Sequence, residues 1–220
     1  MGANPIKVIF LGPSGAGKTS IIKRYIENSW KDNGNMTMGC DLYTCKHVIS
    51  DIFDLTLKFH LWDTAGQERF CSIIPRYYRE AKVALLVFDI TSQKSFEKMK
   101  RWFAELENNA SPMVLCLIGN KTDLDKKREV TKNQAKHYAE SISASYYECS
   151  AQQGEGIREV FDDVARRMIS LLENITGSSE VRSAANTKNT ISLTSRKVGP
   201  SVENNTVTIS GGTIKSRCYC

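Results

Sequence analysis

The stretch GPSGAGKTS, residues 12–20, constrains the fold of this chain more than any other. It satisfies the pattern G-x-x-x-x-G-K-[ST], follows the apolar run IKVIFL at residues 6–11, and precedes a helical pattern at 18–29. A buried strand that enters a glycine-rich turn and then a helix is the context in which this pattern binds phosphate groups. The chain is therefore predicted to bind a nucleoside triphosphate, and the motif alone leaves the base and the reaction open.

Each residue type in this loop suits a phosphate ligand. Glycines allow backbone N–H groups to turn inward around phosphate oxygens, and the helix N-terminus adds a favourable dipole. Lys18 is expected to meet the β- and γ-phosphates, and the Thr19 hydroxyl to bind Mg²⁺. The residues predicted to contact the nucleotide here are Ser14, Gly15, Ala16, Gly17, Lys18, Thr19 and Ser20.

Strand and helix patterns alternate along the rest of the domain. Further strands are predicted at 41–49, 55–62, 83–89, 113–118 and 145–149, and further helices at 94–109, 131–141 and 156–173. The first two of these strands are joined by a short turn, which predicts an antiparallel hairpin at a sheet edge. The order as a whole predicts an α/β fold: a mostly parallel six-stranded sheet with one antiparallel edge strand and helices on both faces. Ligands of such a sheet bind at the carboxyl ends of its strands.

The composition changes near residue 176. From there to residue 220 the chain is rich in Ser, Thr, Asn and Gly, and such a stretch buries too little apolar area to offset the entropy of ordering it. It carries six Lys and Arg against two Glu. We therefore expect one folded domain at 1–175 and a flexible, disordered, basic tail at 176–220.

Composition also bounds the class of protein. No run approaches about 18 apolar residues, the length that spans a bilayer, and the first residues do not resemble a signal peptide. The chain is therefore expected in the cytoplasm.

A net charge of +6 is too slight to indicate a nucleic-acid partner. Five cysteines lack C-x-x-C metal spacing and are expected to be apolar fillers: Cys40, Cys45, Cys71, Cys116 and Cys149.

Two later motifs supply the other parts of a triphosphate site. In WDTAGQERF, residues 62–70, Asp63 suits the Mg²⁺ shell, Gly66 can turn its N–H towards a γ-phosphate, and Gln67 can orient an attacking water. In NKTD, residues 120–123, the carboxylate of Asp123 can accept two N–H bonds from guanine, which adenine does not offer. The predicted ligand is therefore GTP, and Asn120 and Lys121 of the same motif are also predicted to bind it.

The ordered set of motifs resembles the small GTPases of the Ras superfamily, and among them the Rab family. The motifs are GPSGAGKT, MTMGCD, WDTAGQERF, RYYREA, LLVFDITSQKSFE, GNKTDL and CSAQ, and the resemblance covers residues 6–173. It implies a P-loop GTPase domain with GTP/GDP and Mg²⁺ as ligands, in which Thr19, Thr37 and Asp63 hold the metal. Gln67, Lys18 and Thr37 would be the catalytic residues. Trp30 would pack on the nucleotide, and Ser150, Ala151 and Gln152 would line the guanine.

The resemblance also implies partners: an exchange factor, an activating protein that supplies an arginine, a dissociation inhibitor or escort protein, and effectors that contact Leu42, Trp62 and Tyr77. Four positions depart from the family. Leu42 replaces a usual Phe, Gly34 a Tyr over the phosphates, Gln152 a Lys, and Glu80 a Gly. These changes leave nucleotide exchange and effector choice open.

The last residues, SRCYC, do not fit a single-prenyl C-a-a-X signal, because Arg217 occupies the place of its cysteine. The closing C-x-C instead resembles the double-prenylation terminus of Rab proteins. Cys218 and Cys220 are therefore expected to carry lipid that anchors the chain to the cytosolic face of an endomembrane or the plasma membrane, where it would regulate vesicle trafficking.

Two alternatives to a hydrolysing switch remain at this point. A GTP-binding scaffold with little or no hydrolysis would follow if Gly34 and Gln152 spoil closure of the site. A P-loop kinase would need a lid of arginines and a substrate-binding domain, for which the chain has little room.

Overall fold

The computed structural model describes residues 5–31, 37–49, 55–66, 75–110, 114–176, 193–195, 205–207 and 215–216. Its strands are β1 (Ile6–Leu11), β2 (Cys40–Ile49), β3 (Leu55–Thr64), β4 (Val83–Asp89), β5 (Val114–Asn120), β6 (Ser145–Cys149), β7 (Leu193–Ser195), β8 (Asn205–Val207) and β9 (Lys215–Ser216). Its helices are α1 (Lys18–Glu27), α2 (Pro75–Tyr78), α3 (Gln93–Asn109), the 3₁₀ helix η2 (Thr122–Lys127), α4 (Lys132–Ser141) and α5 (Ile157–Thr176).

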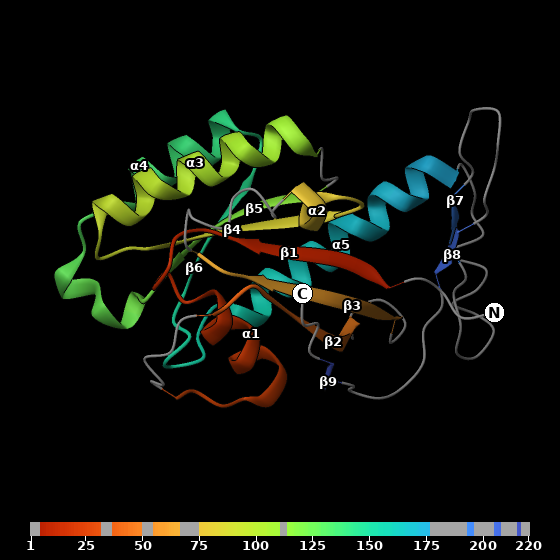
Figure 1. Ribbon diagram of the computed structural model, residues 1–220, viewed down its shortest axis with the longest axis horizontal. Coiled ribbons are helices and arrows are strands. Elements are labelled where there is room, and N and C mark those ends of the chain that lie inside the picture. Colours follow the sequence, from red (N-terminus) through yellow and green to blue (C-terminus); the bar gives the residue numbers. More distant parts are fainter. Residues whose placement is uncertain are drawn as a thin grey trace.

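The central sheet has the strand order β6-β5-β4-β1-β3-β2-β9 (Figure 1). Strands β3, β1, β4, β5 and β6 are parallel neighbours, and β2 pairs antiparallel with β3. The predicted α/β architecture with its antiparallel hairpin is thereby confirmed. The seventh strand, β9, adds two residues to the free edge of β2.

Helices cover both faces of the sheet. Strand β1 shows why, because its apolar side chains point alternately to the two faces and each face must be buried. Ile6, Val8 and Phe10 pack with residues of α1 and α5, such as Phe161. Ile9 and Leu11 pack with residues of α3 and α4 on the opposite face. All side chains of β4 except that of Asp89 are buried, as expected for a central parallel strand covered on both sides.

The boundaries differ from the predicted ones mainly at strand ends. Strand β3 continues to Thr64 and β5 to Asn120, so Asp63 and Asn120 lie within strands. Helices α2 and η2 are too short to give a periodic pattern in the sequence. The short strands β7, β8 and β9 lie in the region expected to be a tail, and backbone pairing of this kind requires no apolar side chains.

Candidate nucleotide and magnesium site

The predicted site residues gather where β1, β3, β5 and β6 end. The phosphate loop follows β1, Asp63 lies near the end of β3, Asn120 ends β5, and Ser150 follows β6. Because these strands are parallel, their carboxyl ends lie at one edge of the sheet (Figure 1). We call residues 12–19 the phosphate loop, 120–123 the NKTD turn and 150–152 the SAQ turn.

At two glycines of the site, neighbouring atoms leave no room for a side chain. Gly17, at the N-cap of α1, has φ +94°, and a Cβ there would collide with the Asn120 amide. A Cβ on Gly66 would collide with the backbone of Pro13 and Ser14, and the Ser14 N–H donates to the Gly66 oxygen at 2.9 Å. The segment after β3 therefore lies directly against the phosphate loop.

Lys18 is a buried cation within this loop. Its side chain is 5% exposed, and its Nζ donates to the carbonyl oxygens of Gly12 at 2.8 Å and Pro13 at 3.1 Å. Burial lowers the pKa of Lys18 to about 8, although the nearby Asp63 carboxylate opposes that shift. An anion at the loop would favour the charged ammonium.

The three residues predicted to bind Mg²⁺ lie together. The Thr19 hydroxyl donates to Asp63 Oδ2 at 2.6 Å, and the Thr37 hydroxyl lies 2.8 Å from that of Thr19. Since the hydroxyl hydrogen of Thr19 is directed to Asp63, the Thr37 hydroxyl is the donor in the second contact. The contacts join α1, β3 and the segment before β2.

Asp63 has the features expected of a buried residue that binds a cation. It is fully buried, and its Oδ1 has no hydrogen-bond partner among the described residues. Burial raises the pKa of Asp63 to about 6, despite the hydrogen bond from Thr19 and the charge of Lys18. Two hydroxyls and a carboxylate are hard oxygen donors of the kind that Mg²⁺ prefers, so these residues fit that ion.

Asn120 connects the phosphate loop with both predicted base-binding turns. Its Nδ2 donates to the Ala16 oxygen at 2.9 Å, and its Oδ1 accepts from the Ala151 N–H at 3.1 Å. The Ser150 hydroxyl donates to Asp123 Oδ1. The NKTD and SAQ turns therefore present an amide and a carboxylate at one place, as a guanine-binding pocket requires.

The other predicted nucleotide-binding residues have fewer contacts with the rest of the site or are exposed. Lys121 has φ +73°, and its Nζ lies 2.6 Å from Asp89 Oδ2. Trp30 is 38% exposed, and the Gln152 side chain is exposed. Gly15 and Ser14 are exposed, and Ser20 is partly buried on the first turn of α1. Gln67, Gly34, Cys71, Cys218 and Cys220 lie outside the described residues.

Arg24 contacts the site although it belongs to none of the sequence motifs. Its Nε donates to the Ala151 oxygen at 2.9 Å, its Nη2 donates to the Gln152 oxygen, and its Nη1 reaches Asn28. The helix that follows the phosphate loop thus holds the SAQ turn by its backbone. No local pattern marks such a residue, because its partner lies 127 positions along the chain.

The three predicted effector residues form one partly buried cluster, with Leu42 and Trp62 on the sheet and Tyr77 on α2. Leu42 and Trp62 face each other across β2 and β3, and the Trp62 and Tyr77 rings lie 5.9 Å apart. The Lys7 ammonium lies 4.2 Å from the centre of the Trp62 ring.

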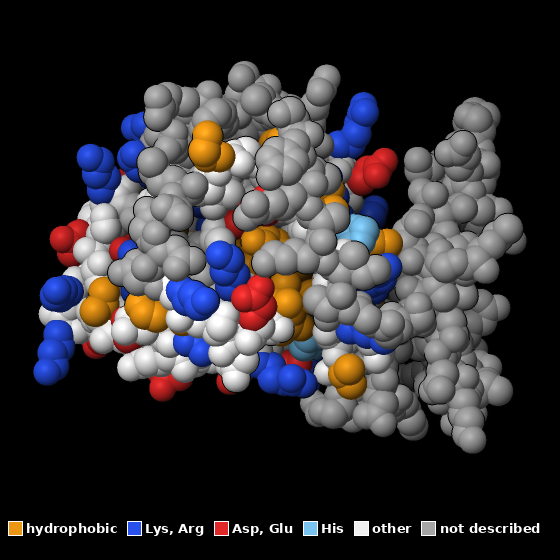
Figure 2. All heavy atoms as spheres, turned by 60° about the horizontal axis from the view of Figure 1, so that its bottom comes forward, with side chains coloured by type: hydrophobic (Ala, Val, Ile, Leu, Met, Phe, Trp, Pro, Cys, Tyr) orange, Lys and Arg blue, Asp and Glu red, His pale blue; other side chains and the backbone are white. Residues whose placement is uncertain are grey.

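Basic and acidic side chains are interspersed over the described surface shown in Figure 2. Among the described residues, no helix has both the length and the apolar character needed to cross a bilayer.

Comparison with known proteins agrees with the predicted resemblance. A family model described as "Ras family" matches residues 7–170. The chain is 43% identical to Ras-related protein Rab-21 of Homo sapiens over 168 residues, which are 76% of this chain and 73% of that protein. It is 43% identical to Rab-21 of Bos taurus over 164 residues, 74% of this chain and 72% of that protein. It is 40% identical to RABF2b of Arabidopsis thaliana over 174 residues, 78% and 86% of the two chains.

Proposed function

Because this chain belongs to the Rab family of small GTPases in the Ras superfamily, we propose that it is a Mg²⁺-dependent GTP/GDP switch that hydrolyses GTP slowly and controls membrane trafficking. The observation that carries the proposal is the contact of Thr19 with both Asp63 and Thr37. It brings together three oxygen donors from three separate motifs, beside a buried lysine.

The phosphate loop would hold the triphosphate. Its backbone N–H groups and the Lys18 ammonium would bind phosphate oxygens, with Gly66 at the γ-phosphate. Mg²⁺, held by Thr19, Thr37 and Asp63, would neutralise negative charge on the phosphates. Thr37 belongs to the segment before β2, so it would leave the site when the γ-phosphate is lost.

The base would be read by the two turns at the ends of β5 and β6. The Asp123 carboxylate would accept N–H bonds from guanine, and the Ser150–Ala151 backbone would lie at its O6. Asn120 would hold both turns on the phosphate loop through its amide.

Hydrolysis would be attack of water on the γ-phosphorus. Gln67 and the Thr37 carbonyl would orient that water, and an activating protein would add an arginine, an effect of about 10³ to 10⁵ in rate. The other proposed partners are an exchange factor, a dissociation inhibitor or escort protein, and effectors on the Leu42, Trp62 and Tyr77 cluster. Lipid on Cys218 and Cys220 would anchor the chain to a cytosolic membrane face.

Single-turnover hydrolysis of GTP by the full chain tests the enzymatic part of this proposal. We expect slow hydrolysis in the presence of Mg²⁺, and its loss in Gln67→Leu, because leucine fills a similar volume but cannot orient water. Both proteins should bind GTP. If the wild type binds GTP but hydrolyses it no faster than Gln67→Leu, the chain is instead a GTP-binding scaffold.

A further inference from the structure

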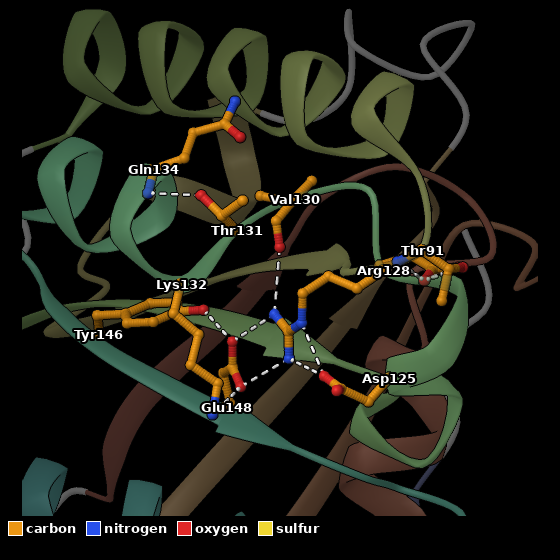
Figure 3. A network of polar contacts seen from close by, with 10 residues as sticks. Thr91, Asp125, Arg128, Val130, Thr131, Lys132, Gln134, Tyr146 and Glu148 are labelled. Atoms are coloured by element: carbon orange, nitrogen blue, oxygen red, sulfur yellow. Dashed lines mark hydrogen bonds and ion pairs between the residues drawn. The ribbon is translucent and has the colours of Figure 1, made fainter.

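Arg128 lies at the centre of a network of polar contacts (Figure 3). Its Nη1 and Nη2 donate to the two carboxylate oxygens of Glu148 at 2.7 and 3.0 Å. Its Nε donates to Asp125 Oδ1 at 2.7 Å, and Nη1 also donates to the Val130 oxygen at 3.1 Å. With Nη2 also 2.7 Å from Asp125 Oδ1, each of the guanidinium nitrogens has at least one oxygen partner.

The cluster connects the two turns that would grip the base. Asp125 lies in η2, two residues after the NKTD turn, and Glu148 lies on β6, two residues before Ser150. Arg128 contacts both elements, and the backbone next to it is held in place. The N–H groups of the following residues, Glu129 and Val130, both donate to the Ile90 oxygen, at 2.9 and 3.1 Å. A change in the Arg128–Glu148 contact would therefore change the spacing of the turns.

The pair is well shielded from water. The Arg128 and Glu148 side chains are 15% and 13% exposed, whereas that of Lys132, 3.4 Å from Glu148, is 70% exposed. Tyr146 adds a hydrogen bond from its hydroxyl to Glu148 Oε1 at 2.6 Å. Burial by itself would raise the pKa of Glu148, but the hydrogen bonds from Arg128 and Tyr146 outweigh burial and hold that pKa below its usual value. A bidentate, shielded pair fixes geometry in a way that an exposed pair does not.

We propose that Arg128 is a positioning residue for guanine. Its bidentate bond to Glu148 sets the distance between the NKTD and SAQ turns, and through that distance it controls both the release of nucleotide and the preference for guanine. This inference rests on the proposed function, because it assigns the base to these turns. Arg128 acts through Asp123 and Ser150 and does not itself touch the base.

The test compares dissociation of GDP and of inosine diphosphate, which lacks the exocyclic amine, from the full-length chain. In Arg128→Gln, we expect GDP release to accelerate at least about fivefold and the preference for GDP over inosine diphosphate to fall. Arg128→Lys should be intermediate, because an ammonium keeps the charge but not the bidentate fork. Arg167→Gln is the matched control, since Arg167 forms an ion pair with Asp163 on α5, away from both turns.

A double-mutant cycle separates positioning from simple loss of stability. Arg128→Gln leaves the largely buried Glu148 with only the exposed Lys132 ammonium and the Tyr146 hydroxyl as partners. The double variant Arg128→Gln, Glu148→Gln removes both charges and should fold even if a single variant does not. A role in positioning predicts reduced guanine preference in the double variant and non-additive effects of the single changes. An unchanged preference in folded Arg128→Gln or in the double variant would overturn the inference. Failure of the wild type to bind GDP would instead contradict the proposed function.

Discussion

The amide of Asn120 donates to the Ala16 oxygen at 2.9 Å and so joins the end of β5 to the phosphate loop. The two residues are 104 positions apart. The same side chain accepts the Ala151 N–H at 3.1 Å, so one buried amide holds the three segments that would surround a nucleotide. Its second role is steric, because the space beside it is large enough only for a glycine at position 17.

We therefore expect Asn120→Ala to accelerate release of GDP at least about tenfold, since it leaves buried backbone groups of Ala16 and Ala151 without partners. Release of a fluorescent GDP analogue measures this rate. Asn109→Ala, at the exposed end of α3, is the control and should release GDP at the wild-type rate. Equal rates for Asn120→Ala and wild type would contradict the bridging role.

Asp123 should determine the choice of base. In Asp123→Asn, the amide would donate to the 2-oxo group of xanthine instead of accepting from the exocyclic amine of guanine, so preference should shift towards XTP. The Ser150 hydroxyl can still donate to the remaining carbonyl oxygen of the amide. Competition binding of GTP against XTP tests this assignment, which is wrong if the variant still prefers GTP.

Folding stability should depend on pH through His47. This ring is 1% exposed on β2, with Nδ1 2.6 Å from the Tyr25 hydroxyl and Nε2 2.8 Å from Asp162 Oδ1. A neutral ring can accept the hydrogen bond of the Tyr25 hydroxyl at Nδ1, whereas Nε2 lies near the Asp162 carboxylate but has no hydrogen-bond partner among the described residues. Burial lowers the pKa of His47; the Asp162 carboxylate opposes this shift, and the charges of Arg158 and Arg166 reinforce it.

Because the folded pKa lies below the unfolded one, the unfolded chain binds the proton more readily, and stability should fall as the pH drops through about 6.5. Thermal unfolding of His47→Gln between about pH 7.5 and 5 should show a smaller loss of Tm than the wild type. The matched control is His137→Gln at an exposed position of α4, which should keep the wild-type pH dependence. A wild-type slope in His47→Gln would exclude His47 as its source.

Membrane attachment should require Cys218 and Cys220, which lie outside the described residues. Each buried CH₂ of a lipid chain adds about 0.8 kcal/mol to membrane binding. One lipid chain therefore gives only reversible binding, whereas two chains make a lasting anchor. We expect the full chain expressed in eukaryotic cells to have the mass of two geranylgeranyl groups, and Cys218→Ser plus Cys220→Ser to move it from membranes to cytosol. Cys71→Ser is the control for loss of a thiol elsewhere. Unmodified thiols on membrane-bound protein would contradict this prediction.

The sequence by itself determined the parts of the protein that depend on local chemistry. A strand, a glycine-rich turn and a helix in succession over residues 6–29 define a phosphate loop, and the order of later motifs indicates guanine, Mg²⁺ and the α/β fold. Strand positions also followed from local patterns, and β4 and β6 begin and end at the predicted residues. Residue type and short spacing are sufficient for these inferences.

Only the tertiary structure decided which distant residues support the site. Arg24 reaches the SAQ turn, Arg128 reaches Glu148, and His47 lies between Tyr25 and Asp162, yet none of these residues belongs to a motif. Charged and polar residues usually lie at a solvated surface, and nothing in the local sequence around Arg24, Arg128 or His47 shows that its side chain contacts a distant partner. The partner in each case comes from another element, and only the tertiary packing of those elements brings the two together.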